Sequence, residues 1–335
     1  MHLRTPAALL ALLLAGAALA GEASRAAAAA EKAESFTVDS RDYPWSAIGR
    51  LNRSTGGFCT GVLIGPRIVL TAAHCLYYKR TSHWLPPEAI HFLAGYSRGE
   101  FGGHSLARDY AVAPGYDPAK PAAIGTEPTD WALVLLEEPL GDAAGYLGWA
   151  AKSAQAPTDL THPNGRLLEA GYRQSRAHLL SVRSGCEVVA LAANGVFLHS
   201  CDSIQGESGS PLIIFAQGAF QVVGVQVARI TSRKSGALGA AIAPDPASLS
   251  KFHFGHATHP EDWGNSEARI PAKRRAPVAT VQQLLARLGY DPGSADGVMR
   301  EKTTDAVKRF QRDHGHPPDG VVSVALLGQL IEALR

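Results

Sequence analysis

Hydrophobic positions from residue 36 to residue 243 fall in short runs, separated by breaks rich in glycine, proline and asparagine. The clearest runs read GVLIGPRIVL, WALVLL, EVVALA, PLIIF and FQVVGVQVARI. Because no long segment with a 3.6-residue period interrupts them, the pattern predicts strands rather than helices. Many short strands at this spacing indicate a β-barrel or a β-sandwich.

The pattern changes after residue 243. Residues 244–276 are polar and broken, and we interpret them as a linker. They contain three histidines at three-residue spacing, a pattern compatible with metal binding, but Pro260 interrupts any helix that would carry the rings together. The histidines are His253, His256 and His259, and a basic run follows at Lys273, Arg274 and Arg275.

From residue 277 onward the hydrophobic period becomes helical. Helices are predicted over residues 281–290, 303–315 and 323–334, joined by the turn-rich connectors DPGSADG and HPPDG. Thr280 and Gln283 have the spacing of a capping box at the start of the first helix. Residues 277–335 are therefore expected to form a separate three-helix domain.

The N-terminus has the layout of a secretory signal peptide. Two basic residues precede an apolar run over residues 6–20, which ends in small residues, so we expect cleavage after Ala20. The run is short for a membrane-spanning helix, which predicts a mature chain without a membrane segment. Residues 21–35 are alanine-rich and are interpreted as a leader or short pro-segment.

Composition limits the partners of this chain. Its 335 residues suggest one large domain or two, and a hydrophobic content of 46% supports a core. The formal net charge is only +2, so nothing indicates binding to nucleic acid or to an anionic membrane.

The chain has four cysteines. Export to an oxidising compartment would allow them to form two disulfides. Three pairings are possible. Cys59 and Cys75 flank one apolar stretch and Cys186 and Cys201 flank another, so we predict that each neighbouring pair is bonded. A zinc site is the alternative, but no CxxC spacing supports it.

The stretch DSIQGESGSP places Ser208 among small residues. A reactive serine needs an open approach and backbone N–H groups aimed at the attacked carbonyl, although a tight polar turn has the same composition. Catalysis would also require a histidine base and an acid that orients it. His74 in TAAHC and Asp130 in TDWALVLLEEPL are the candidates, with Asp117 in APGYDP as the alternative acid.

Three segments, FCTGVLIGPRIVLTAAHC, DWALVLLEEP and GESGSP, occur in the order seen in the chymotrypsin-fold serine peptidases and resemble their signatures. PWSAIGRL, GSP after the serine and the Cys186/Cys201 pair resemble the secreted bacterial branch that includes the glutamyl endopeptidases. The resemblance implies an all-β fold of two six-stranded antiparallel barrels, with the site between them and no metal or cofactor. It assigns His74 as general base, Asp130 as its orienting acid and Ser208 as nucleophile, with the N–H groups of Gly206 and Ser208 as oxyanion hole.

The segment around the serine also resembles the specificity pocket of trypsin-like enzymes. It places Asp202 and Ser203 in the pocket, and a buried Asp202 would favour lysine or arginine before the cut bond. Gln226 stands where glutamyl endopeptidases carry a histidine, which weighs against glutamate. Arg229 weighs the other way, because its guanidinium can pair with Asp202 or meet an acidic substrate.

Two residues beside the serine depart from the animal trypsins. Ile204 replaces a cysteine, and Glu207 replaces the aspartate that pairs with a freshly cut N-terminus.

The last domain resembles the type 1 peptidoglycan-binding module. The turns at Asp296-Gly297 and Asp319-Gly320, with AVKRFQ between them, match that module. REKTT departs from the Gly-x-x-Thr that commonly follows the first turn. A plain three-helix interaction domain is the alternative interpretation. The sequence therefore predicts a secreted or periplasmic serine endopeptidase that cuts polypeptides and is held at the cell wall. A catalytically silent wall-binding scaffold and a peptidase acting on peptidoglycan cross-links are the competing hypotheses.

Overall fold

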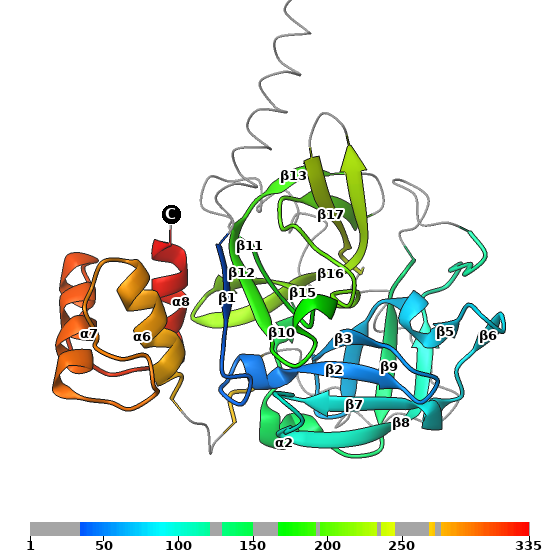
Figure 1. The fold of residues 1–335 in the computed structure, drawn as a ribbon, viewed down its shortest axis with the longest axis horizontal. Coiled ribbons are helices and arrows are strands. Elements are labelled where there is room, and N and C mark those ends of the chain that lie inside the picture. Colours follow the sequence, from blue (N-terminus) through cyan, green and yellow to red (C-terminus); the bar gives the residue numbers. More distant parts are fainter. Residues whose placement is uncertain are drawn as a thin grey trace, which may run out of the picture.

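The computed structural model describes residues 34–120, 129–149, 167–191, 195–232, 236–244, 268–271 and 276–334. Two β-domains lie side by side, and three helices pack at the outer edge of one of them (Figure 1). The predicted signal peptide, the linker histidines and most of the leader lie outside the described residues. No helix in the described part of the chain is long and apolar enough to cross a membrane.

The first β-domain is a closed antiparallel barrel with the strand order β2-β3-β4-β9-β8-β7. Strand β9 is buried along its whole length, as the apolar run WALVLL predicts for a strand inside a packed barrel. The strands are β2 (Ile48–Arg53), β3 (Phe58–Leu63), β4 (Ile68–Thr71), β7 (Ile90–Ala94), β8 (Gly103–Val112) and β9 (Ala132–Leu136).

The second β-domain is a nine-stranded sheet with the path β1-β12-β11-β15-β16-β17-β14-β13, and β10 pairs beside β16. Strands β12 and β13 are one run of chain, interrupted only at Glu187, so the two sides of the sheet meet and six strands enclose a second core. The strands are β1 (Glu34–Thr37), β10 (Gly148–Trp149), β11 (Leu167–Gly171), β12 (Ser181–Cys186), β13 (Val188–Leu191), β14 (Val196–His199), β15 (Pro211–Ala216), β16 (Ala219–Ser232) and β17 (Gly236–Ile242). The predicted all-β architecture is confirmed.

Short elements connect the barrel strands. The one that matters for the site is the 3₁₀-helix η2 (Ala73–Leu76), which directly follows β4. The others are η1 (Trp45–Ala47), η3 (Pro87–Ala89), η4 (Gln174–Arg176), the hairpin of β5 (Tyr77–Tyr78) and β6 (His83–Trp84), and α2 (Leu140–Ala144).

The C-terminal helices are α6 (Val278–Arg287), α7 (Glu301–Asp313) and α8 (Val324–Ala333). The predicted capping box at Thr280 is wrong: α6 begins at Val278, after Pro277, so Thr280 is buried within the first turn. A side-chain cap does begin α8, where Ser323 Oγ accepts a hydrogen bond from Leu326 N at 3.0 Å.

The helices pack directly on the second β-domain. A Cβ atom on Gly328 of α8 would collide with the ring of Phe215 on β15, so glycine allows the two surfaces to touch. The guanidinium of Arg287 lies 5.1 Å from the ring centroid of Phe36 on β1. The three-helix domain is therefore in contact with the β-domain and not only tethered to it.

Candidate active site

His74 and Asp130 come from neighbouring strands of the first barrel. His74 lies on η2 just after β4, and Asp130 lies just before β9, which pairs with β4. Asp130 Oδ2 lies 2.8 Å from His74 Nδ1, and Asp130 Oδ1 accepts from the backbone N–H of His74 at 2.9 Å. Both oxygens of the Asp130 carboxylate thus bond to His74, which fixes the orientation of its imidazole ring.

The environment of this pair determines the histidine tautomer. The Asp130 side chain is 4% exposed and that of His74 is 27% exposed. Because an ionised carboxylate only accepts hydrogen bonds, Nδ1 carries the proton and Nε2 remains as the acceptor. The alternative acid, Asp117, instead accepts from Ala119 N and lies 3.6 Å from Lys120 in a surface turn.

Ser208 lies on the loop between β14 and β15, which presses against the first barrel. Thr60 N–H donates to the carbonyl of Ser208 at 2.8 Å, and Gly209 N–H donates to the carbonyl of Gln226 at 2.8 Å. Gly209 has a φ of +81°, and a Cβ there would collide with Thr60 O and Thr71 Oγ1. Glycine is therefore required where this loop meets the strands that lead to His74.

Of the five residues from Gly206 to Ser210, two have a backbone N–H without an acceptor among the described residues. The N–H groups of Glu207, Gly209 and Ser210 all bond to backbone carbonyls. Within the described residues, no hydrogen bond engages the N–H of Gly206 or that of Ser208. Gly206 has a φ of +95°, a conformation that turns the loop sharply at this point.

Both predicted disulfides are present, Cys59 with Cys75 and Cys186 with Cys201. The first ties β3 to η2 beside His74. Two groups of potential metal ligands occur in the described part of the chain, one at His74 and one at His199, but the cysteine sulfurs in both are disulfide-bonded. Neither group can therefore offer a thiolate to a metal.

The four predicted pocket residues divide into an exposed pair and a buried pair. Asp202 was expected as a buried carboxylate, but its side chain is 57% exposed and lies 3.0 Å from Arg229, which is 46% exposed. Ser203 and Gln226 are buried. Ser203 Oγ donates to Glu169 Oε1 at 2.8 Å, and Gln226 Oε1 accepts from His199 Nε2 at 2.7 Å.

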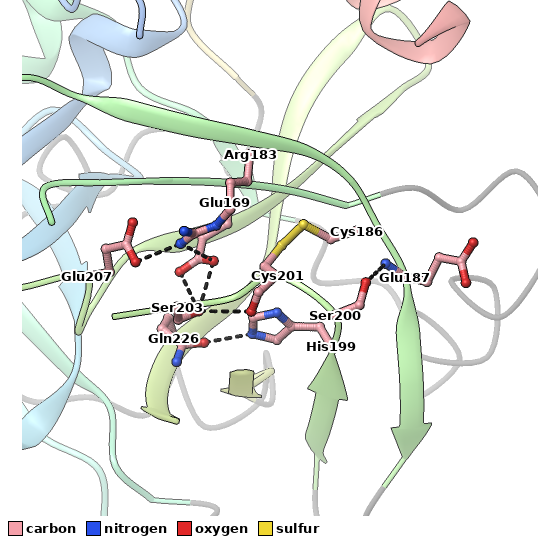
Figure 2. The surroundings of a disulfide bond; sticks show 10 residues. All are labelled: Glu169, Arg183, Cys186, Glu187, His199, Ser200, Cys201, Ser203, Glu207 and Gln226. Atoms are coloured by element: carbon pink, nitrogen blue, oxygen red, sulfur yellow. Dashed lines mark hydrogen bonds and ion pairs between the residues drawn. A yellow bond between two sulfur atoms is a disulfide. The ribbon is translucent and has the colours of Figure 1, made fainter. Parts of the chain in front are cut away.

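Sequence reasoning missed a buried polar cluster behind this loop, formed by Glu169, Arg183, His199 and Glu207 (Figure 2). A signal was present for Glu169, which is the one charged residue of the apolar strand LLEAG, whereas Arg183 lies beside serines in SVRSGC and gives no such signal. Burial lowers the pKa of His199 to about 4. Burial and the nearby Glu169 carboxylate raise the pKa of Glu207, against the opposing effect of Arg183.

Residues 35–244 match the family model described as Trypsin. The chain belongs to the trypsin family. Beyond this trypsin domain, residues 274–330 match a model described as a putative peptidoglycan binding domain. The two matched segments correspond to the β-domains and the three-helix domain of the structure.

Relatives of this trypsin-family chain share moderate identity. It is 25% identical over 174 residues to a glutamyl endopeptidase of Bacillus licheniformis, covering 51% of the chain, and it spans about half (49%) of that relative's length. It is 25% identical over 193 residues to trypsin beta of Drosophila erecta, covering 51% of the chain and 69% of that protein. A 60-residue segment is 38% identical to the localization factor PodJL of Caulobacter vibrioides, covering 18% of the chain and 6% of that protein.

A solved Glu endopeptidase structure in complex with MPD has the same fold. Its TM-score is 0.52 at 22% identity, and the match covers 64% of this chain and 93% of that one.

Proposed function

We propose that this protein is a serine endopeptidase that cuts polypeptides through Ser208, His74 and Asp130. The observation that carries the proposal is the two-point bond of the buried Asp130 carboxylate to His74, which leaves His74 Nε2 as a proton acceptor. The serine loop meets the same barrel through Thr60. The trypsin-family match and the resemblance of three ordered motifs support the same assignment.

The reaction follows from the roles of these groups. Ser208 Oγ attacks the carbonyl carbon of the substrate while His74 Nε2 takes the serine proton. The N–H groups of Gly206 and Ser208 receive the developing oxyanion. His74 then gives the proton to the leaving amine. In the second step His74 takes a proton from a water molecule, which attacks the acyl-enzyme, and the proton returns to Ser208 as the acid product leaves. The proposed chemistry uses no metal or cofactor.

The cell wall is the proposed location, because residues 274–330 match a peptidoglycan-binding model and the N-terminus resembles an export signal. The three-helix domain would hold the peptidase near wall-associated or secreted polypeptides, either in the periplasm or outside the cell. No nucleic acid and no membrane is proposed as a partner of the mature chain.

A fluorophosphonate probe tests the catalytic assignment. In the labelling step the Ser208 hydroxyl displaces fluoride from phosphorus and its proton passes to His74. Ser208→Ala should abolish labelling and lower casein cleavage by about a million-fold, whereas the exposed control Ser54→Ala should leave both unchanged. A wild-type protein that is folded but neither labelled nor active would support the silent scaffold. Release of muropeptides with casein left intact would support cross-link cleavage.

Cosedimentation tests the location without truncating the chain. The inactive Ser208→Ala protein should pellet with purified cell-wall sacculi and stay in the supernatant once the sacculi are digested with lysozyme. Equal pelleting with and without intact sacculi would contradict wall binding.

A further inference from the structure

The residue next to the proposed nucleophile is anchored from behind by a buried arginine. Arg183 Nη2 lies 2.6 Å from Glu207 Oε2 and 3.0 Å from Glu169 Oε2. The side chains are almost fully buried, at 6% exposure for Arg183, 1% for Glu207 and 0% for Glu169. One guanidinium thus bridges two carboxylates that are almost completely shielded from water.

Arg183 and Glu169 form the fixed side of this cluster. They lie directly opposite each other on β12 and β11, two antiparallel strands of the second β-domain. Their positions are therefore set by the sheet and do not depend on the serine loop. Only Glu207 belongs to that loop, so the ion pair between Arg183 and Glu207 ties a loop to a sheet.

Further bonds fasten the same loop to the cluster. Ser203 Oγ lies 2.8 and 2.9 Å from the two oxygens of Glu169, which share its single proton. Ile204 N–H donates to Glu207 Oε2 at 2.7 Å, and Arg173 Nε lies 3.3 Å from Glu207 Oε1. The chain from Ser203 to Glu207 is thereby held at both ends.

The charge balance explains why Arg183 is needed. Without its guanidinium, Glu169 and Glu207 would be two buried carboxyl groups whose one ion-pair partner among the described residues is Arg173, so they must move apart or one of them must take up a proton. The carboxylate on the sheet cannot move away, whereas Glu207 can swing outward with its loop. That movement would turn the backbone on both sides of Glu207, namely Gly206 and Ser208.

We propose that Arg183 is a positioning residue for the serine loop: by holding Glu207 against the sheet, it sets the backbone N–H groups of Gly206 and Ser208 in the geometry that receives the oxyanion. The inference rests on the proposed function, because it needs Ser208 to be the nucleophile. Preorganised donors lose their effect when they are displaced by a fraction of an ångström to an ångström, so an anchor outside the site controls the rate.

Arg183→Met and Arg183→Lys test the proposal in the full-length protein, with Arg53→Met on β2 of the other barrel as a half-buried arginine control. Removing one oxyanion donor costs about 10²- to 10³-fold in rate. Arg183→Met should therefore lower kcat and the rate of fluorophosphonate labelling at least 100-fold with little change in KM. The His74 Nδ1 proton resonance should persist, because the bond to Asp130 is untouched. The control should keep at least half of the wild-type rate.

Charge rescue separates positioning from general loss of structure. Glu169→Gln in the Arg183→Met background removes the repulsion and should restore the labelling rate at least tenfold relative to Arg183→Met alone. Arg183→Lys should lose about tenfold, because one ammonium cannot span both carboxylates as the planar guanidinium does. If Arg183→Met does not fold, the labelling rate of Arg183→Lys tests the proposal instead.

The proposal is overturned if the folded Arg183→Met or Arg183→Lys protein is labelled at the wild-type rate, or if Glu169→Gln gives no rescue. Labelling of the wild-type protein at Ser208 must be shown first. Its absence would refute the proposed function, whereas wild-type labelling together with unaffected Arg183 variants would refute only the positioning role.

Discussion

We predict that the buried His199 makes the stability of this protein sensitive to acid. Its ring lies on β14 with no exposed surface, and Nε2–H donates to Gln226 Oε1 at 2.7 Å. Its other nitrogen, Nδ1, has no hydrogen-bond partner within the described residues. Burial is the main reason why the pKa falls from 6.5 to about 4, and the positive charge of Arg183 contributes in the same direction.

The sign and size of the effect follow from proton linkage. Between pH 6.5 and pH 4 the unfolded chain holds the proton on this histidine and the folded chain does not, so unfolding takes up a proton and stability falls as the pH falls. The difference between the two pKa values corresponds to about 3 kcal/mol at pH 4. About 2 kcal/mol of this is lost between pH 7.5 and pH 5.

His199→Gln isolates this contribution, because the glutamine amide can still donate to Gln226 but does not titrate. Urea unfolding of oxidised protein at pH 7.5 and pH 5, in the Ser208→Ala background to prevent autolysis, gives the free energy of unfolding at each pH. The acid-induced loss should be about 2 kcal/mol smaller in the glutamine variant. Equal losses in the two proteins, within about 0.5 kcal/mol, would refute the assignment of the acid sensitivity to His199.

Two other predictions concern the serine loop and the pocket. Gly209→Ala should slow fluorophosphonate labelling at least tenfold, because the added Cβ would collide with Thr60 and Thr71. The control Gly218→Ala should not slow labelling, because Gly218 has a similar positive φ of +77° but open surroundings. Equal labelling rates for the two variants would contradict the close packing at Gly209. Arg229→Ser should increase cleavage after lysine and arginine in a peptide library, because it releases the charge of Asp202, and an unchanged profile would exclude Asp202 from the choice of substrate residue.

The sequence was informative where chemistry depends on short segments. His74, Cys75 and Ser208 lie in compact motifs, and Asp130 directly precedes an apolar run. Their proposed roles and the disulfide pairing could therefore be predicted from short sequence motifs. The two-barrel fold followed from the same segments through a family resemblance. The break of the long β12–β13 strand at Glu187 was not predictable, because it depends on which neighbouring strand each half pairs with.

Residues whose state depends on distant partners were misjudged or missed. Asp202 is exposed and pairs at the surface with Arg229, which lies 27 positions further along the chain. The ion pairs of Arg183 with Glu169 and Glu207 join β11, β12 and the serine loop. No local sequence pattern predicts which charged side chains will contact one another. Thr280 has the spacing of a cap, but the helix begins earlier because Pro277 precedes it and proline favours the start of a helix.

The two halves of the proposed site are fixed by different interactions, and Thr60 connects them. On the first barrel the Cys59–Cys75 disulfide holds the segment that carries His74, and on the second the Arg183 cluster holds the serine loop. Thr60 lies fully buried between them: its N–H donates to the Ser208 carbonyl at 2.8 Å, and its hydroxyl donates to the Gly206 carbonyl at 3.2 Å. Because Thr60 directly follows Cys59, any displacement of the disulfide-bonded strand would be transmitted to the serine loop. The alignment of base and nucleophile therefore depends on the packing of one barrel against the other as well as on the three proposed catalytic side chains.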